Sequence, residues 1–496
     1  MDFKKFLKNH WLIIIILFFA SLVRFWRVGG FTTFAGDQGI DFLIVKRMLI
    51  DGEFTLLGPK LGSFSNIAII YLGPIYYYLI APFLFFFNFD PIGPAIFIVL
   101  LSLLTVVLIY LIGLNFFNKP VAVLASVIFA FSVPIVNESR VALNPNPIPF
   151  FSAVLIFSLF KIIIHNSKSL IWPVLFGISS GVLFQLHYLT MSLIFLSIIF
   201  ILKKRYLGKI IILIMAFLIT IAPQILFELR HEFFISKQII ARIQDGGDIS
   251  SISTFTQNLH RGLELISSLI FYYENFYLGA IIIALMLLLI FLKREESKKV
   301  YLFFVISILI SIFLASIYAL DPQLHYFAHV YPILALLISL AIYLLADSLK
   351  RFHIKAILII ILILFLTTNF SNLGLNRNEG YTMPEGWNLT GVKNTSKLIT
   401  KDASDNRTFN IAATLDGDTR ARPYRYLVEV YGKKPLGVEN YPESDILYLI
   451  SRDGKNAILD YYVWEVASFK PFNFESEWHI QNGITLYKLT KGNKTL

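Results

Sequence analysis

The chain has 496 residues, a formal net charge of +11 and 56% hydrophobic residues. A mean hydropathy of +0.70 exceeds what one water-soluble core of this length hides from solvent, which excludes an ordinary soluble enzyme and indicates a protein embedded in lipid. There is no cysteine, which excludes disulfides and thiolate metal sites, and the positive residues are scattered over loops, which argues against nucleic-acid binding.

About twelve apolar runs follow one another, each near the ~20 residues that cross a hydrocarbon core. The first run follows three lysines and lacks a cleavage pattern, so we expect it to stay as a membrane helix with its amino terminus in the cytoplasm. The runs are Trp11–Val28, Ile67–Phe87, Ile92–Leu114, Val121–Val136, Ile148–Ile164, Leu170–Leu186, Leu189–Leu202, Ile210–Phe227, Leu263–Leu292, Val300–Leu320, Val330–Leu345 and Ile354–Leu366.

Clusters of lysine and arginine between the runs predict the orientation, because such residues stay on the cytoplasmic side. Three clusters occur, at residues 203–205, 293–299 and 350–355. They place everything after Asn369 outside the cytoplasm, which an even number of crossings would not allow. We therefore expect about 11–13 transmembrane helices, with an odd number preferred. Either the Gly73-Pro74 segment is re-entrant, or the long run Leu263–Leu292 conceals a second element.

The composition becomes mixed and polar from about residue 370, and no later run is long enough to span. The sequence therefore predicts an all-α polytopic membrane domain over residues 1–369 and a small exported α/β domain over residues 370–496. Strands are expected at Phe409–Ala412, Ile446–Ile450 and Gly483–Tyr487, and a helix at Arg422–Tyr431. The aromatic and basic residues of this helix could contact a glycan or pack against the membrane domain.

The first outer loop, about residues 29–71, carries two carboxylates close to the membrane surface. Asp37 and Asp41 are four residues apart, so a helix that begins near Asp37 would present both on one face. Asp37 is a candidate base that takes a proton from, or orients, an incoming hydroxyl group. The alternative is that Asp37 only caps the helix.

A second polar segment runs from Asn137 to Asn146 between two apolar runs. Its alternating prolines prevent a helix, so the backbone must face water or be buried in protein. Arg140 at a membrane boundary requires an anion, which is either a phosphate or the neighbouring Glu138 or a lipid headgroup.

A third segment, Phe227 to His231, ends a span and is followed by further cations. Arg230 is placed to clamp a phosphate through paired hydrogen bonds. The alternative is an amphipathic surface helix that touches anionic headgroups. Further polar groups interrupt apolar runs at Gln185 with His187, at His325 beside Tyr326, and at His329. Such histidines more often satisfy a neighbouring helix than bind a ligand, and their pattern indicates no metal site.

Four segments in order resemble bacterial membrane glycosyltransferases, the group that includes protein O-mannosyltransferases and the aminoarabinose transferase of lipid A. The segments are Gly36–Asp41, Leu72–Leu79, Ser139–Asn146 and Phe227–Phe233. Their order and spacing match over about residues 10–345, and the polar tail resembles the exported domain that many members carry.

The resemblance implies a GT-C type fold and a multi-pass protein of the cytoplasmic membrane. It implies a polyprenyl-phosphate sugar as donor and an extracytoplasmic acceptor, with Asp37 as the catalytic carboxylate and inversion at the anomeric carbon. Arg140, Arg230 and His231 would hold the departing phosphate. The other residues expected to bind substrate are Gln38, Asp41, Asn144, Asn146, His187, Glu228, His325 and Tyr326.

Protein O-mannosyltransferases carry an Asp-Glu pair in the first outer loop, whereas here Asp37 is followed by Gln38. Because an amide is neither a base nor a strong metal ligand, Gln38 is expected to position sugar or acceptor, and a divalent metal has no support in the sequence. The main alternative function is a transporter or flippase of lipid-linked saccharides. The polar segments lie at span ends and no internal repeat is visible, which favours the enzyme.

Overall fold

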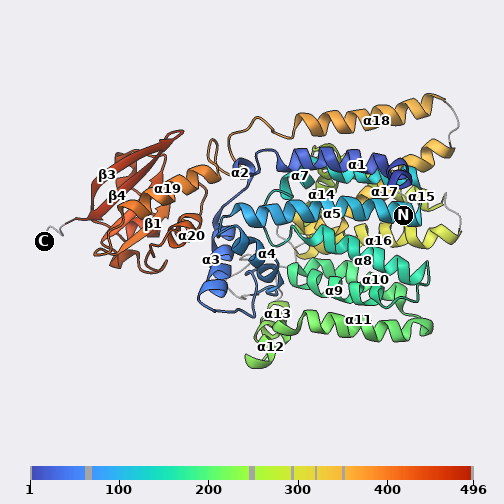
Figure 1. The fold of residues 1–496 in the computed structure, drawn as a ribbon, viewed down its shortest axis with the longest axis horizontal. Coiled ribbons are helices and arrows are strands. Elements are labelled where there is room, and N and C mark those ends of the chain that lie inside the picture. The colour runs from blue at the N-terminus through green and yellow to red at the C-terminus, as the bar shows by residue number, and fades with distance from the viewer. Residues whose placement is uncertain are drawn as a thin grey trace.

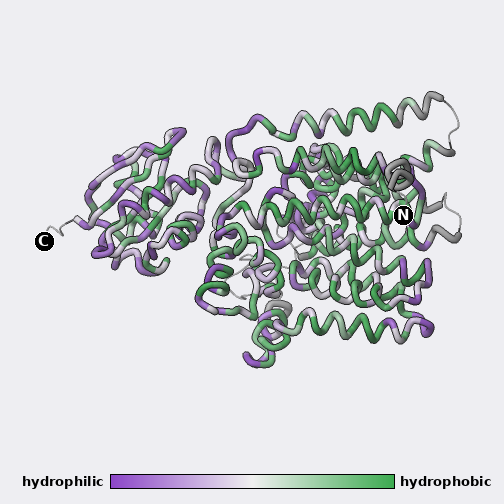
Figure 2. Tube along the Cα trace, in the orientation of Figure 1, coloured by the Kyte–Doolittle hydropathy of each residue, from purple (hydrophilic) through white to green (hydrophobic). Residues whose placement is uncertain are grey.

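The computed structural model describes residues 3–61, 70–244, 252–291, 295–318, 321–348 and 352–492. The described chain forms a bundle of apolar helices with a small sheet-containing domain at one end (Figure 1). Hydropathy separates the two parts, because the bundle helices are largely hydrophobic and the small domain is mixed (Figure 2). The expected fold class, a helical membrane domain followed by a small α/β domain, is confirmed.

Within the described residues, the larger part consists of helices. They are α1 (Phe3–Phe25), α2 (Val28–Phe31), α3 (Gly36–Ile50), α4 (Ile75–Phe86), α5 (Ile92–Phe116), α6 (Lys119–Phe131), α7 (Val133–Glu138), α8 (Ile148–Ile163), α9 (Ile171–Leu186), η1 (Tyr188–Thr190), α10 (Met191–Ile201), η2 (Lys204–Tyr206), α11 (Leu207–Thr220), α12 (Ala222–Arg230), α13 (Phe234–Gln244), α14 (Ile252–Phe271), α15 (Phe276–Phe291), α16 (Glu295–Tyr318), η3 (Leu324–Val330), α17 (Tyr331–Ser348) and α18 (Phe352–Ser371).

The amino-terminal end of α1 and the small domain lie at opposite ends of the bundle (Figure 1). The connection from α10 to α11, which carries the basic residues Lys203 to Arg205, lies at the same end as the start of α1. A chain that enters at one end and leaves at the other passes along the bundle an odd number of times. An even count of twelve therefore does not fit this path.

Length and composition alone qualify three helices within the described residues as membrane spans: Ile92–Phe116, Lys299–Ile317 and Leu324–Ala346. The number rises to five if each of two bent pairs counts as one span, and seven further apolar helices are 10 to 17 residues long. One bent pair is α14 with α15, whose axes meet at 83°. The run Leu263–Leu292 thus contains two elements, which is one of the two alternatives that the sequence left open.

Helix α4 begins directly after Pro74 and has 12 residues. Its length of about 18 Å is well short of the ~30 Å of a hydrocarbon core. The run Ile67–Phe87, part of which lies outside the described residues, is therefore not one span-length helix. The non-helical Gly73-Pro74 segment precedes α4, and the Gly73 N–H donates to the Gln185 carbonyl in the last turn of α9 at 3.2 Å.

The small domain is built on a four-stranded sheet of order β1-β2-β4-β3, in which β1 and β2 are parallel and the other pairs are antiparallel. Helix α20 connects the two parallel strands. The elements are α19 (Leu389–Asp402), β1 (Phe409–Ala413), α20 (Arg422–Val430), η4 (Tyr441–Glu443), β2 (Ile446–Ser451), α21 (Lys455–Leu459), α22 (Trp464–Ala467), β3 (Phe472–Gln481) and β4 (Ile484–Lys491). All three expected strands and the expected helix are present, whereas α19 and β3 were not predicted.

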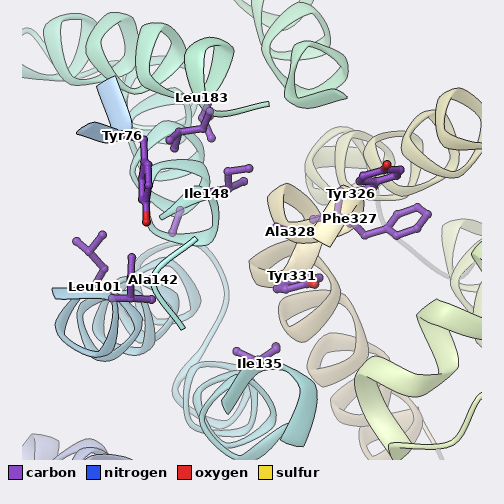
Figure 3. Close-up of a cluster of buried hydrophobic side chains, with 14 of the residues drawn as sticks. Tyr76, Leu101, Ile135, Ala142, Ile148, Leu183, Tyr326, Phe327, Ala328 and Tyr331 are labelled. Atoms are coloured by element: carbon purple, nitrogen blue, oxygen red, sulfur yellow. The ribbon is translucent and has the colours of Figure 1, made fainter. Parts of the chain in front are cut away.

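Buried apolar side chains from distant parts of the chain meet inside the bundle (Figure 3). Ala142, within the proline-rich connection between α7 and α8, and Ile148, the first residue of α8, are each 1% exposed. This irregular backbone is therefore enclosed by protein rather than by lipid, as the bilayer requires of non-helical segments.

Candidate active site

The first turn of α3 presents Asp37 without using it as a cap. Ala35 is the N-cap residue, and its backbone N–H donates to the side-chain Oε1 of Gln38 at 3.0 Å. Gln38 is 2% exposed, whereas Asp37 is exposed. The capping interaction thus belongs to Gln38, and the Asp37 carboxylate stays accessible at the positive end of the helix dipole.

Asp37 lines a polar cavity of about 470 Å³ between the two parts of the molecule. We call it the polar cavity. Its described lining residues are Thr33, Ala35, Gly36, Asp37, Gln38, Leu143 and Thr382, together with Gly417, Asp418, Thr419, Arg420 and Arg422 of the small domain. The small domain therefore supplies one wall of the cavity, and α3 supplies the opposite wall.

Two glycines of the Gly36-Asp37-Gln38-Gly39 motif allow this close approach. A β-carbon at Gly39 would lie 2.5 Å from the backbone carbonyl carbon of Arg422, and one at Gly36 would lie 3.0 Å from Cγ of Asp418. Real side chains do not tolerate the first of these distances, so only glycine fits at residue 39. The motif is thus a docking surface for the start of α20 as well as the start of α3.

An aromatic cluster and an ion pair hold α20 on α3. The ring of Tyr426 packs edge-on against Phe34 and Phe42, with centroids 5.8 and 5.9 Å away, and its hydroxyl donates to the carbonyl of Phe89 at 2.6 Å. Lys46 Nζ lies 3.2 Å from Glu429 Oε1. The predicted helix therefore packs against the membrane domain through Tyr426, while Arg422 at its start reaches the polar cavity.

Asp418 is the second carboxylate of the polar cavity. Its Oδ2 accepts the backbone N–H of Arg422 at 2.8 Å, and its Oδ1 lies 3.7 Å from Nε of the same arginine. Burial raises the pKa of Asp418; the hydrogen bond from Arg422 and the charges of Arg422 and Arg425 partly offset this increase, and the charge of Asp37 adds the smallest contribution to it. The two carboxylates thus line the same space.

Asp41 lies one turn after Asp37 but in a different environment. It is 5% exposed and accepts a hydrogen bond from the Tyr77 hydroxyl at 3.1 Å. Burial raises the pKa of Asp41 to about 8, partly offset by the Tyr77 hydrogen bond and increased further by the charge of Asp37. Near neutral pH Asp41 is therefore mainly protonated, whereas Asp37 is the carboxylate that faces the polar cavity.

A larger cavity of about 1030 Å³ lies between α10, α12, α13 and α16, and we call it the apolar groove. Its described lining is Leu61, Ile70, Phe184, Tyr188, Leu189, Met191, Ser192, Phe195, Leu196, Ile199, Ile221, Gln224, Ile225, Glu228, Leu229, Phe233, Ile235, Ser236, Ile239, Ile310, Leu314 and Ile317. An apolar lining with a few polar groups suits the hydrocarbon part of an amphipathic ligand.

The segment after α12 lies beside this groove. Glu228 accepts the backbone N–H groups of Ile235 and Ser236, each at 2.9 Å, and so caps α13. His231 stacks on Phe227 with centroids 4.1 Å apart. Arg230 and His231 are both exposed and directly follow the groove residue Leu229. These two side chains therefore lie where a headgroup could meet them.

The predicted polar segment 137–146 is used largely for internal contacts. Arg140 is 2% exposed and donates to the Val23 carbonyl. Asn144 donates to the Leu186 carbonyl at 2.8 Å, and Asn146 donates to the Glu138 carbonyl at 2.8 Å. These side chains satisfy backbone oxygens, and none of the three is among the described residues that line the polar cavity.

Three predicted residues from two separate connections come together. The His187 ring lies 5.1 Å from Tyr326 and 6.1 Å from His325, between centroids. His329 instead forms hydrogen bonds with the hydroxyl groups of Ser311 at 2.7 Å and Ser192 at 3.1 Å. It therefore bonds to neighbouring helices, which was the alternative to ligand binding. Within the described part of the chain, no three His, Cys, Asp or Glu side chains are grouped so that they could hold a metal ion.

Residues 72–227 match the family model of dolichyl-phosphate-mannose-protein mannosyltransferases. No curated protein sequence matches the chain. The fold is similar to that of ArnT from Cupriavidus metallidurans, both in the apo state (TM-score 0.63) and bound to undecaprenyl phosphate (0.62). Each of these comparisons has 11% identity and covers 97% of this chain and 98% of that chain.

An oligosaccharyltransferase from Archaeoglobus fulgidus, tethered to an acceptor peptide with the NVT sequon, is similar at a TM-score of 0.51 and 12% identity. The match covers 86% of this chain and 64% of that chain. The shared architecture is the GT-C fold, which the sequence resemblance implied.

Asp418, Thr419, Arg420 and Arg422 were not predicted as site residues. The signal available was weak: a polar loop that follows a predicted strand and precedes a predicted helix. Only the contact of α20 with α3 brings this loop to Asp37, which lies 381 positions before Asp418.

Proposed function

We propose that this chain, a polytopic membrane protein of the GT-C glycosyltransferase type, transfers one sugar from a polyprenyl-phosphate donor to a hydroxyl group outside the cytoplasm. The observation that carries the proposal is the exposed Asp37 carboxylate in a polar cavity between two domains. Such a carboxylate can accept a proton from a hydroxyl nucleophile that enters the cavity.

In the proposed reaction the acceptor oxygen attacks the anomeric carbon while its proton moves to Asp37. The bond between that carbon and the phosphate oxygen breaks, the electron pair stays on the phosphate, and the configuration inverts. The electrons and the proton balance without a nucleotide or a redox partner. Asp41, which is protonated near neutral pH, supports the helix beneath Asp37 rather than serving as a second base.

The apolar groove is the proposed place for the polyprenyl chain. Its lining suits hydrocarbon, and the similar ArnT fold has been seen with undecaprenyl phosphate. Arg230 and His231, exposed beside Leu229, are proposed to hold the phosphate through charge-assisted hydrogen bonds. Arg140 is not included in this role because it is buried against the Val23 carbonyl.

The test compares wild type with Asp37→Asn in reconstituted vesicles that contain radiolabelled polyprenyl-phosphate sugars. Removing a general base costs about 10²- to 10⁴-fold in rate, so transfer should fall by that amount while donor binding persists. Asp51→Asn is the matched control, because Asp51 is an exposed carboxylate at the other end of α3. Equal activity of the two variants would remove Asp37 from the chemistry.

A transporter or flippase of lipid-linked saccharides remains the alternative function. Transporters place their polar site near the middle of the membrane, between repeats. Here the polar cavity is lined by α3 and by the small domain, at the end of the bundle where the two parts meet, which favours transfer over transport. Movement of a fluorescent lipid-linked sugar across vesicles, without any transfer, would favour the flippase.

A further inference from the structure

The loop Gly417–Arg422, which joins β1 to α20, forms the wall of the polar cavity opposite Asp37. The backbone carbonyl of Thr419 accepts a hydrogen bond from the Ala413 N–H at 3.2 Å. Within the described residues, the Thr419 hydroxyl makes no hydrogen bond. The Ala421 N–H donates to the Asp418 carbonyl at 3.0 Å. The loop backbone is thus held by hydrogen bonds to β1 and within the loop, and Asp418, Thr419, Arg420 and Arg422 are among the residues that line the cavity.

The loop is also fixed relative to Asp37. Arg422 begins α20, and its backbone lies against Gly39, only two residues after Asp37. The Tyr426 and Glu429 contacts with α3 then anchor the rest of this helix. A ligand between the two walls therefore meets a preorganised set of groups, which is what orientation of a nucleophile requires.

The chemistry of the lining fits a neutral, hydroxyl-rich ligand. The described lining contains two carboxylates, Asp37 and Asp418, and two guanidinium groups, Arg420 and Arg422, so the formal charges cancel. Apart from glycines, its apolar members are Ala35 and Leu143. Neighbouring hydroxyls of a sugar ring both donate and accept hydrogen bonds, which matches carboxylates, guanidinium groups and threonine hydroxyls in one space.

Arg420 has donors to spare for such a ligand. Its nearest carboxylates are Glu465 at 3.7 Å and Glu439 at 4.0 Å, both beyond hydrogen-bond distance, and its side chain is 39% exposed. A guanidinium group offers five N–H donors in a fixed plane, so two loose ion pairs leave several of them available.

We propose that the loop Gly417–Arg422 is the acceptor-binding wall and that the acceptor is a carbohydrate. Arg420 and Thr419 hold hydroxyls of the acceptor sugar so that another hydroxyl of the same ring faces Asp37. The inference rests on the proposed transfer reaction and adds its acceptor class. The carbohydrate can belong to a soluble glycan or to a glycolipid, because both present the same ring.

The experiment measures transfer by the full-length protein in vesicles with a saturating donor. The acceptor probes are labelled oligosaccharides of glucose, galactose, mannose and N-acetylglucosamine, the same sugars on an alkyl glycolipid, and a serine- and threonine-rich peptide. We expect transfer to at least one carbohydrate probe. A lower KM for the glycolipid than for its free oligosaccharide identifies the membrane as the source, and the reverse order identifies a soluble glycan.

Arg420→Gln should raise the acceptor KM about tenfold or more, with the donor KM unchanged, because it removes charge-assisted donors from the acceptor alone. Arg407→Gln is the matched control. Arg407 is also an arginine of the small domain, lies 3.5 Å from Glu475 and has a similar exposure of 40%, but it is not among the described residues that line the cavity. Its acceptor KM should equal that of wild type.

Thr419→Val provides a second, nearly isosteric variant if Arg420→Gln lowers the thermal stability. It should raise the acceptor KM several-fold. Acceptor KM values within twofold of wild type for both variants would overturn the assignment of the wall. Transfer to the peptide alone would overturn the carbohydrate acceptor but leave the transfer reaction standing, whereas absence of transfer to every probe would overturn both.

Discussion

Gly39 and Arg422 touch through their backbones, although they stand 383 positions apart in the chain: a β-carbon at Gly39 would fall 2.5 Å from the Arg422 carbonyl carbon. This contact joins the helix that carries Asp37 to the helix that closes the polar cavity. It makes the small domain part of the site rather than an independent module.

Gly39→Ala should therefore disturb both stability and transfer. Overpacking a well-packed contact costs about 1–3 kcal/mol, and here the shift would separate Asp37 from the opposite wall. Gly208→Ala in α11 is the control, because a β-carbon there meets nothing within 4 Å. We expect a lower melting temperature and at least about tenfold slower transfer for Gly39→Ala only. A Gly39→Ala protein as active as the control would show that the domains need not dock this closely.

The ion pair between Lys46 and Glu429 should stabilise the same interface. Their side chains are 14% and 11% exposed, so removing Glu429 leaves the Lys46 charge poorly hydrated and also removes the 3.5 Å ion pair of Glu429 with Arg47. Glu429→Gln is expected to destabilise the protein by about 1–3 kcal/mol. A double-mutant cycle that combines Glu429→Gln with Lys46→Met, measured by thermal unfolding, gives the coupling energy between the two side chains. This coupling energy should exceed that of an ion pair exposed on the surface. Additive effects of the two substitutions would indicate that the pair contributes nothing to docking.

Asp41 should make stability depend on pH. Because burial raises its folded pKa to about 8, above the unfolded value, the folded state binds the proton more tightly. The stabilising effect of the neutral acid is present at low pH and is lost as pH rises through about 8. The asparagine side chain of Asp41→Asn stays neutral at every pH. The melting temperature of this variant minus that of wild type should therefore increase between pH 5 and pH 8. A difference that stays constant over this range would contradict the buried, protonated acid.

The sequence predicted the parts of the site that depend on local pattern. The helix predicted to begin near Asp37 is α3, which begins at Gly36. The helix predicted from Arg422 is α20. Strand β3 was not predicted, because bulges between Phe474 and Ser476 and between His479 and Gln481 interrupt its alternation. Helix α19 is largely polar, so its narrow apolar face gave little signal.

What sequence could not provide was contact between distant segments. For Arg140 the sequence left the partner open between a phosphate and Glu138 or a lipid headgroup, and in the structure one partner is the Val23 carbonyl. Gly39 lies in the first turn of α3, and nothing in the sequence indicates that its lack of a side chain allows the approach of Arg422. Both contacts depend on tertiary packing, and tertiary packing leaves no repeating pattern of residues in the sequence from which it could be predicted.

The apolar groove yields a final prediction on donor binding. Ile225 lines the groove, so Ile225→Trp should fill part of it and raise the donor KM about tenfold or more, with the acceptor KM unchanged. Ile214→Trp is the control, since Ile214 is 47% exposed on α11 and is not among the described groove residues. Donor KM is measured with one polyprenyl-phosphate sugar in vesicles of constant composition. If both tryptophan variants bind the donor like wild type, the lipid chain lies elsewhere on the bundle, and Arg230 and His231 lose their proposed role as well.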